Sequence, residues 1–193
     1  MTTKEINLRR KFLATKDTLA DKINEIAKER GRTVFSIVNE ALGAFIRANE
    51  WGKDLTTIIE DAKILEMAKN SGMTLIPEPL HERLMESTSF DTKMKDYWRS
   101  SGIVFGKYLE INNINDPRRV ERILKEVVGV NPDISISKDR LVCISPRLGE
   151  KRSEAVAIFL EGVMSSMGLE TSSREVSKGI IVLKFKQEGE TDA

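Results

Sequence analysis

The chain has one cysteine and one histidine in 193 residues, and it has no apolar stretch as long as a membrane span. Cys143 therefore cannot form a disulfide within one chain, and the two residues are too few for a zinc site of the usual cysteine and histidine type. We expect no metal and no cofactor. Because an N-terminal signal segment is also absent, the sequence predicts a cytoplasmic protein with no membrane partner.

Residues that would indicate catalysis are equally scarce. His81 and Cys143 are far apart in the sequence and lie in no recognisable local signature, while the many carboxylates occur beside Lys or Arg. No glycine-rich phosphate loop is present. Cys143 belongs to an apolar segment and is expected to be a small buried side chain, and His81 is expected at the surface or in a cap. The sequence predicts that the protein is not an enzyme.

The first fifty residues predict a short basic strand, a helix, a glycine-centred turn and a second helix. Residues 8–15 are the predicted strand, and Leu19, Ile23 and Ile26 follow at helical spacing before the turn at residues 31–33. A second apolar stripe then begins, with Val34, Val38, Leu42, Phe45 and Ile46. So short a unit leaves most of its apolar surface in water, and we expect it to dimerise.

Positive charge is concentrated at the beginning of the chain. Residues 1–16 contain five Lys or Arg and one Glu, although the net charge of the whole chain is only +1. A local basic patch is typical of a surface that binds phosphates. Thr33 is expected to cap the second helix, whose free amides could hold a backbone phosphate.

This order of elements resembles the Arc/MetJ-type ribbon-helix-helix family, in which two chains pair their strands into a ribbon that lies in the DNA major groove. The resemblance covers residues 1–50 and implies a homodimer that binds double-stranded DNA. The residues expected to contact DNA are Arg9, Arg10, Lys11, Phe12, Arg32 and Thr33.

Two questions about the strand stay open at this stage. Alignment with the family turns Arg10, Phe12 and Ala14 toward the bases, whereas hydrophobicity turns Phe12 inward and Arg9 and Lys11 outward, because a slip of one residue exchanges the two faces. The alternative to DNA binding is that the basic residues only solvate a strand edge.

The rest of the chain predicts a connecting helix over residues 51–72 and an α+β domain over residues 73–186, with an antiparallel sheet covered by helices. Asp54 and Gly72 are the expected ends of the connecting helix. Residues 73–76 could form a short strand, and the two prolines that follow are expected to prevent regular structure. Later helices are predicted over residues 91–111, 116–129 and 151–167, hairpins over residues 133–145 and 169–186, and a disordered tail over residues 187–193.

The second domain resembles the 4-vinyl-reductase (hydrocarbon-binding) domain. The resemblance rests on residues 159–164, 168–170, 175–179 and 183–185, and on a helix bearing Gly102 and Gly106. It implies an apolar cavity that senses a small molecule, lined by Trp98, Phe105, Tyr108, Phe159 and Met164. Family members often carry cysteines in the last hairpin, where this chain has Ser173 and Ser177 and no cysteine. The alternative is that these apolar side chains fill the core.

The favoured interpretation is a dimeric DNA-binding transcriptional regulator whose second domain senses an apolar small molecule or mediates assembly into a dimer or higher oligomer. The alternative is an antitoxin-like or scaffold protein whose second domain binds a partner protein. A closed cavity would favour a ligand, and a large exposed apolar patch would favour a protein partner.

Overall fold

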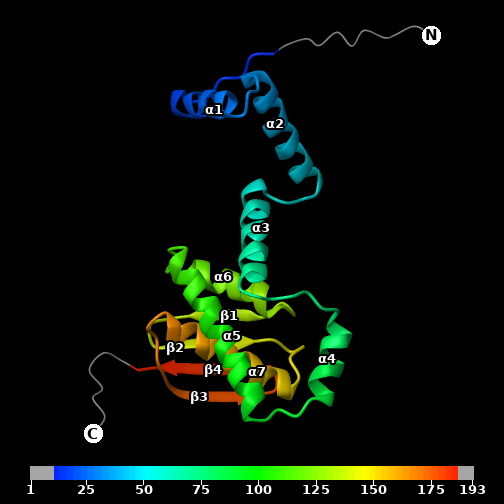
Figure 1. The fold of residues 1–193 in the computed structure, drawn as a ribbon, viewed down its shortest axis with the longest axis vertical. Coiled ribbons are helices and arrows are strands. Elements are labelled where there is room, and N and C mark those ends of the chain that lie inside the picture. Colours follow the sequence, from blue (N-terminus) through cyan, green and yellow to red (C-terminus); the bar gives the residue numbers. More distant parts are fainter. Residues whose placement is uncertain (1–10, 187–193) are drawn as a thin grey trace, which may run out of the picture. The chain divides into compact units, whose positions relative to one another are not determined.

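The structure is a computed structural model that describes residues 11–186, and within them it contains seven helices and one four-stranded antiparallel sheet (Figure 1). The predicted α+β class is confirmed. The chain divides into two compact units, Met1–Ile59 and Glu60–Ala193. None of the described helices is long and apolar enough to cross a membrane.

The first unit contains the two predicted helices, α1 (Asp17–Glu29) and α2 (Val34–Glu50), joined by a tight turn. Gly31 has φ of +60° in this turn, where a side chain would be strained. Thr33 caps α2, because its side-chain oxygen accepts a hydrogen bond of 3.2 Å from the amide of Ser36.

The predicted strand of the ribbon is not supported. Residues 11–15 have no regular structure, and residues 8–10 of that prediction lie outside the described residues. The sheet strands all come late in the chain, so residues 11–15 have no neighbouring strand with which to form a ladder of hydrogen bonds. A ribbon therefore requires a second copy of the chain.

Helix α3 (Leu55–Asn70) begins and ends where the sequence predicts, and the boundary between the two units falls within it. Asp54 accepts a hydrogen bond of 3.1 Å from the amide of Thr57, and Gly72 has φ of +90°. The next two predictions are wrong, since residues 73–77 form no strand and α4 (Glu78–Ser87) follows at once. Pro79 lies in the first turn of α4, where a missing amide hydrogen costs no helical bond.

Three further helices confirm the predictions for the second unit. They are α5 (Thr92–Ile111), α6 (Pro117–Val128) and α7 (Glu150–Ser166). Asp91 caps α5 by accepting from the amide of Met94 at 2.9 Å, and Asp116 caps α6 by accepting from the amide of Arg119 at 2.9 Å. These local hydrogen bonds fix where the helices begin.

The sheet consists of β1 (Asp133–Ile136), β2 (Arg140–Ile144), β3 (Thr171–Ser177) and β4 (Ile180–Phe185), in the order β1-β2-β4-β3. The two predicted hairpins are confirmed, and β2 and β4 pair between them. Alternate residues of the central strands are buried on one face, so that Cys143 lies opposite Ile181 and Leu141 lies opposite Leu183.

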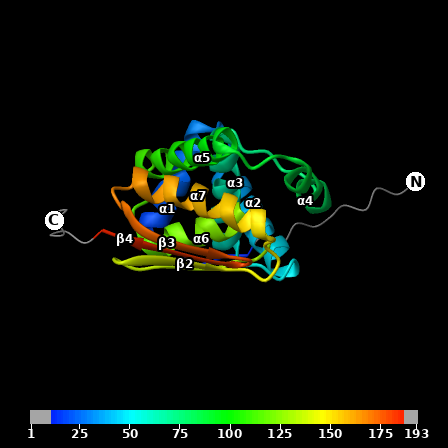
Figure 2. The same cartoon turned by 90° about the horizontal axis from the view of Figure 1, so that it is seen from below.

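Helix α7 lies between the sheet and α5, which makes three layers (Figure 2). The α5–α7 contact is unusually close, because three glycines meet the facing helix. A Cβ on Gly102 would lie 2.1 Å from the carbonyl oxygen of Phe159, and one on Gly162 would lie 2.4 Å from that of Arg99. The close packing predicted for Gly102 and Gly106 is therefore found, and α7 is its partner.

Candidate functional site

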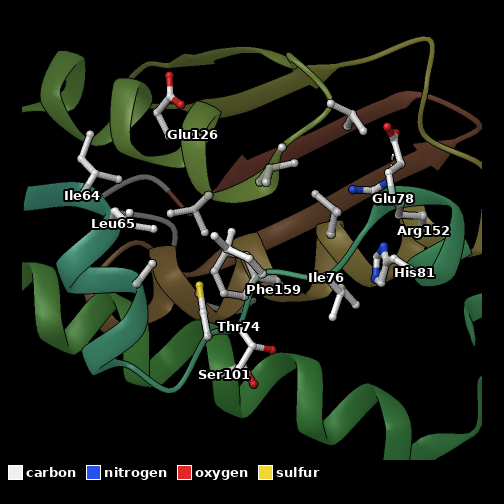
Figure 3. A pocket seen from close by; sticks show the side chains of 18 of the residues that line it. Ile64, Leu65, Thr74, Ile76, Glu78, His81, Ser101, Glu126, Arg152 and Phe159 are labelled. Carbon is white, nitrogen blue, oxygen red and sulfur yellow. Dashed lines mark ion pairs between the residues drawn. The ribbon is translucent and has the colours of Figure 1, made fainter. Parts of the chain in front are cut away.

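The second unit contains a pocket of about 840 Å³. Its wall is built by α3, the segment that precedes α4, the middle of α5, the end of α6 and the first half of α7 (Figure 3). The volume lies within the range of about 300–1,000 Å³ that is common for small-molecule sites. The pocket is partly open to solvent, and its volume is large enough for a small ligand.

One stripe of α7 supplies much of the pocket wall. Arg152, Val156 and Phe159 are spaced by four and three residues, so they lie on one face of the helix. Trp98 and Ser101 on α5 face the same space. Ile64 and Ile76 add apolar surface from α3 and from the segment before α4 (Figure 3). The middle of the pocket is thus mostly apolar.

Charged groups gather at the end of the pocket between α4 and α7, where Figure 3 shows Glu78, His81 and Arg152 close together. Arg147 donates a hydrogen bond from Nη2 to Oε2 of Glu78. Nη1 of Arg152 lies 3.7 Å from Oε1 of Glu78, which is too long for a hydrogen bond. Among the described residues, this Nη1 is the one buried side-chain nitrogen or oxygen with no hydrogen-bond partner.

His81 is half-buried beside this cluster. Burial lowers the pKa of His81 below its usual range, and the nearby Arg152 guanidinium lowers it further, because both disfavour a second positive charge. The imidazole is therefore neutral near pH 7 and can donate or accept a hydrogen bond inside the pocket.

A strained loop closes one side of the pocket after α6. Gly129, Val130 and Asn131 all have positive φ, with values of +69°, +58° and +46°. A β-branched residue rarely adopts this conformation. The hydroxyl of Ser145 donates a hydrogen bond of 3.0 Å to the carbonyl oxygen of Val130 and helps to hold it. Such strain is often found at binding sites, where the surrounding structure maintains it.

The five residues that were expected to contact a ligand fall into two groups in the structure, those that line the pocket and those that fill the core. Trp98 and Phe159 line the pocket, but Phe105 and Met164 are fully buried in the core and do not line it. Tyr108 packs on the core, and its hydroxyl accepts a hydrogen bond of 3.1 Å from Asn70. Phe105, Met164 and Tyr108 therefore agree with the alternative interpretation, in which these apolar side chains fill the core.

Sequence reasoning missed the polar end of the pocket altogether. Glu78, Arg147 and Arg152 occur in charged segments that look like solvated helix ends, and His81 was expected at the surface. The one signal in the sequence that could have indicated this end of the pocket was the lone histidine. The groups that affect its pKa come from α7 as well as from its own helix.

The residues expected to contact DNA are placed only in part. Arg9 and Arg10 lie outside the described residues, and Lys11 and Phe12 are exposed at the start of the described chain. Arg32 donates hydrogen bonds to the carboxylate of Glu40 and, at 2.7 Å, to the hydroxyl of Ser36. Its guanidinium is therefore already engaged by α2, and Thr33 serves as the helix cap.

The two helices of the first unit bury very little in a single chain. Among its described residues only Ala27 and Ala48 are buried. The large apolar side chains of α1 and α2 that stay exposed are Leu19, Ile26, Val34, Phe35, Leu42, Phe45 and Ile46. These seven residues are called the apolar face of the first unit below.

Neither a metal site nor a match to a known protein adds to this description. Within residues 11–186 no cluster of three or more His, Cys, Asp or Glu is placed to hold a metal ion. A comparison of the chain with protein-family models, with curated proteins and with solved structures finds no match.

Proposed function

We propose that this protein is a dimeric DNA-binding transcriptional regulator, with a first unit that pairs with its twin on DNA and a second unit that binds a small apolar effector. The apolar face of the first unit is the observation that carries this proposal. Phe45 is 56% exposed, Ile46 54% and Leu19 52%, in a unit with almost no core of its own.

A second copy of the chain is the natural cover for this face. Fully burying a Leu, Ile or Phe side chain contributes about 1.5–3 kcal/mol, so covering seven half-exposed side chains contributes roughly 5–10 kcal/mol per copy. Two copies together offset the cost of association, about 4–15 kcal/mol. The same association would give residues 11–15 the strand partner that they lack in a single chain.

The basic segment gives such a dimer its DNA surface. Two chains bring two copies of Arg9, Arg10 and Lys11 together, and a two-stranded ribbon of this charge fits the major groove. Arg32 is already engaged by Glu40, and this hydrogen bond lowers the pKa of the Glu40 carboxyl below its usual range, so a backbone phosphate would have to compete with Glu40 for Arg32.

Sedimentation of the full chain tests the dimer. Phe45→Glu should convert it to a monomer, because a charge would be buried in the proposed interface. Ile111→Glu is the matched control, since Ile111 is 78% exposed in the second unit and should tolerate the charge. A wild-type chain that sediments as a monomer would refute the proposal.

A salt titration of duplex binding tests the DNA surface. Replacing Arg9, Arg10 and Lys11 together by Ala should weaken binding and reduce the salt slope by about 0.9 for each phosphate that the protein no longer neutralises. The control replaces three exposed basic residues of the second unit by Ala and so removes the same charge: Lys107, Arg118 and Lys138. If both triple variants lower the slope equally, binding follows net charge and the proposed surface is wrong.

A further inference from the structure

We propose that the pocket of the second unit binds an amphipathic carboxylate, whose carboxylate is held by Arg152 and whose apolar body lies against Val156, Phe159 and Trp98. This names the class of effector, and its regulatory meaning rests on the function proposed above. The binding itself depends only on the second unit.

Arg152 is the reason to expect an acceptor in the ligand. Its side chain is only 12% exposed, and its buried Nη1 has no hydrogen bond within residues 11–186. A buried donor without an acceptor is costly, so nearly all such donors in proteins are satisfied. The nearest carboxylate, that of Glu78, remains 3.7 Å away because Arg147 already binds its other oxygen. Arg152 lines the pocket, and a rotation of its side chain would bring this donor to the acceptor of a bound ligand.

The charge at this end of the pocket favours an anion. Within the wall of this pocket, two guanidinium groups, those of Arg147 and Arg152, face one carboxylate, that of Glu78, and His81 beside them is neutral near pH 7. Glu82, Glu86 and Glu150 lie with Lys151 in a neighbouring pocket that Arg152 also borders, so the positive excess belongs to the wall of the first pocket alone. The N-terminus of α7 adds little to this potential, because Glu150 in the first turn of the helix offsets the positive end of its dipole.

The other charged groups of the wall do not cancel this excess. Asp61, Lys69 and Glu126 line the pocket from α3 and α6, and Figure 3 shows Glu126 well separated from Arg152. Asp61 accepts a hydrogen bond of 3.0 Å from Arg122, which also pairs with Glu60, so this side of the wall stays acidic. The anion site is therefore confined to the α4–α7 end.

The geometry favours one carboxylate over a phosphate. The guanidinium fork can bind either group with two parallel hydrogen bonds, but a carboxylate carries one negative charge whereas a phosphate carries up to two, and the Glu78 carboxylate close to Arg152 repels the larger charge more. Beyond Arg152 the wall turns apolar along one stripe of α7, with Val156 and then Phe159. An extended or aromatic carbon body would follow this stripe toward Trp98.

Isothermal titration of the full chain provides the test. The probes are octanoate and 4-phenylbutyrate, each with the alcohol of the same carbon body, 1-octanol and 4-phenyl-1-butanol. At least one carboxylate should bind ten-fold or more tightly than its alcohol. Arg152→Gln should remove that preference while leaving alcohol binding within about two-fold, because it removes the charge and keeps the apolar wall.

Three other variants keep the result interpretable. Val156→Trp should weaken both members of a pair by filling the apolar stripe, and Arg152→Lys should keep part of the preference. Lys138→Gln, an exposed change in the β1–β2 turn, should leave all affinities unchanged. The thermal midpoint of each ligand-free variant is measured first. If Arg152→Gln fails to fold, the proposal is decided by the relative affinity of the wild-type chain for carboxylate and alcohol and by the loss of affinity in Val156→Trp.

Two outcomes would overturn the inference: no probe binds the wild-type chain, or carboxylates and alcohols bind equally. DNA binding is measured separately with and without the tighter carboxylate. If the carboxylate binds through Arg152 but DNA affinity does not change, the ligand site is supported and the regulatory role proposed above is refuted, so the two failures are distinguishable.

Discussion

Replacing Gly162 by Ala should destabilise the second unit, although alanine is the better helix former. Gly162 is in the middle of α7, where its Cα faces Gly102 of α5. An added Cβ would lie 2.4 Å from the carbonyl oxygen of Arg99 and 3.0 Å from the amide nitrogen of Ile103. Both neighbours are backbone atoms, which cannot rotate away as a side chain could. The two helices must separate.

The size of the loss follows from two opposing terms. Helix propensity favours Ala over Gly by about 1 kcal/mol. Overpacking a tight contact costs about 1–3 kcal/mol and more where the backbone must move, and separating α5 from α7 also loosens the contact between Phe105 and Phe159, whose ring centroids are 6.0 Å apart. We expect a net loss of roughly 2 kcal/mol, which lowers the thermal midpoint by about 5–10 °C.

Urea unfolding followed by circular dichroism measures this loss. The matched control is Gly149→Ser at the beginning of α7, where an added Cβ meets nothing within 4 Å and a serine can cap the helix. Gly102→Ala should cost about as much as Gly162→Ala, and the double variant should cost less than the sum, because one separation of the helices relieves both clashes. A Gly162→Ala variant as stable as the wild type, or a strictly additive double variant, would refute the close backbone contact.

Two predictions concern titratable groups. Burial, with a smaller effect of Asp133, raises the pKa of the Cys143 thiol to about 11. In the native protein this thiol should therefore react with an aromatic disulfide reagent only as fast as the second unit opens, and Gly162→Ala should accelerate the reaction. Immediate reaction at pH 8 would contradict the burial of Cys143. Burial and Arg152 lower the pKa of His81 in the folded protein, so the unfolded chain binds a proton at His81 more readily than the folded chain does. The free energy of unfolding should therefore fall as the pH drops below about 6.5. His81→Gln should reduce this fall in the thermal midpoint between pH 7.5 and 5.5, and an equal fall in both proteins would show that His81 does not contribute.

The sequence predicted the features that neighbouring residues decide. Thr33 and Asp54 were expected at the beginnings of their helices, and each accepts a hydrogen bond from an amide three residues later, a range of contact that the sequence shows directly. Asp91 and Asp116, where two further helices were predicted to begin, form the same contact. The prediction of a strand at residues 73–76 failed because a strand also needs an open edge to pair with, and no local pattern shows where such an edge lies. The helix after Pro77 was missed because a proline can either prevent a helix or begin one, as Pro79 does in α4.

An apolar cavity lined by Trp98 and Phe159 was predicted, but the rest of its lining could not be, for a different physical reason, which lies in α7. From Ser153 to Met164 nearly every residue of this helix is buried, since the sheet covers one side and α5 covers another. A helix surrounded by protein has no polar face, so its periodicity does not show which stripe borders a cavity and which fills the core. Leu160 and Phe159 are adjacent and both apolar, yet only Phe159 lines the pocket. Arg152 lies on the same face of α7 as Val156 because it precedes Val156 by one turn. This spacing places Arg152 in the pocket only once the structure shows which face of α7 lines it. The ligand-binding role proposed for Arg152 therefore depends on how the layers assemble, and substitutions along that stripe test it more directly than any sequence pattern.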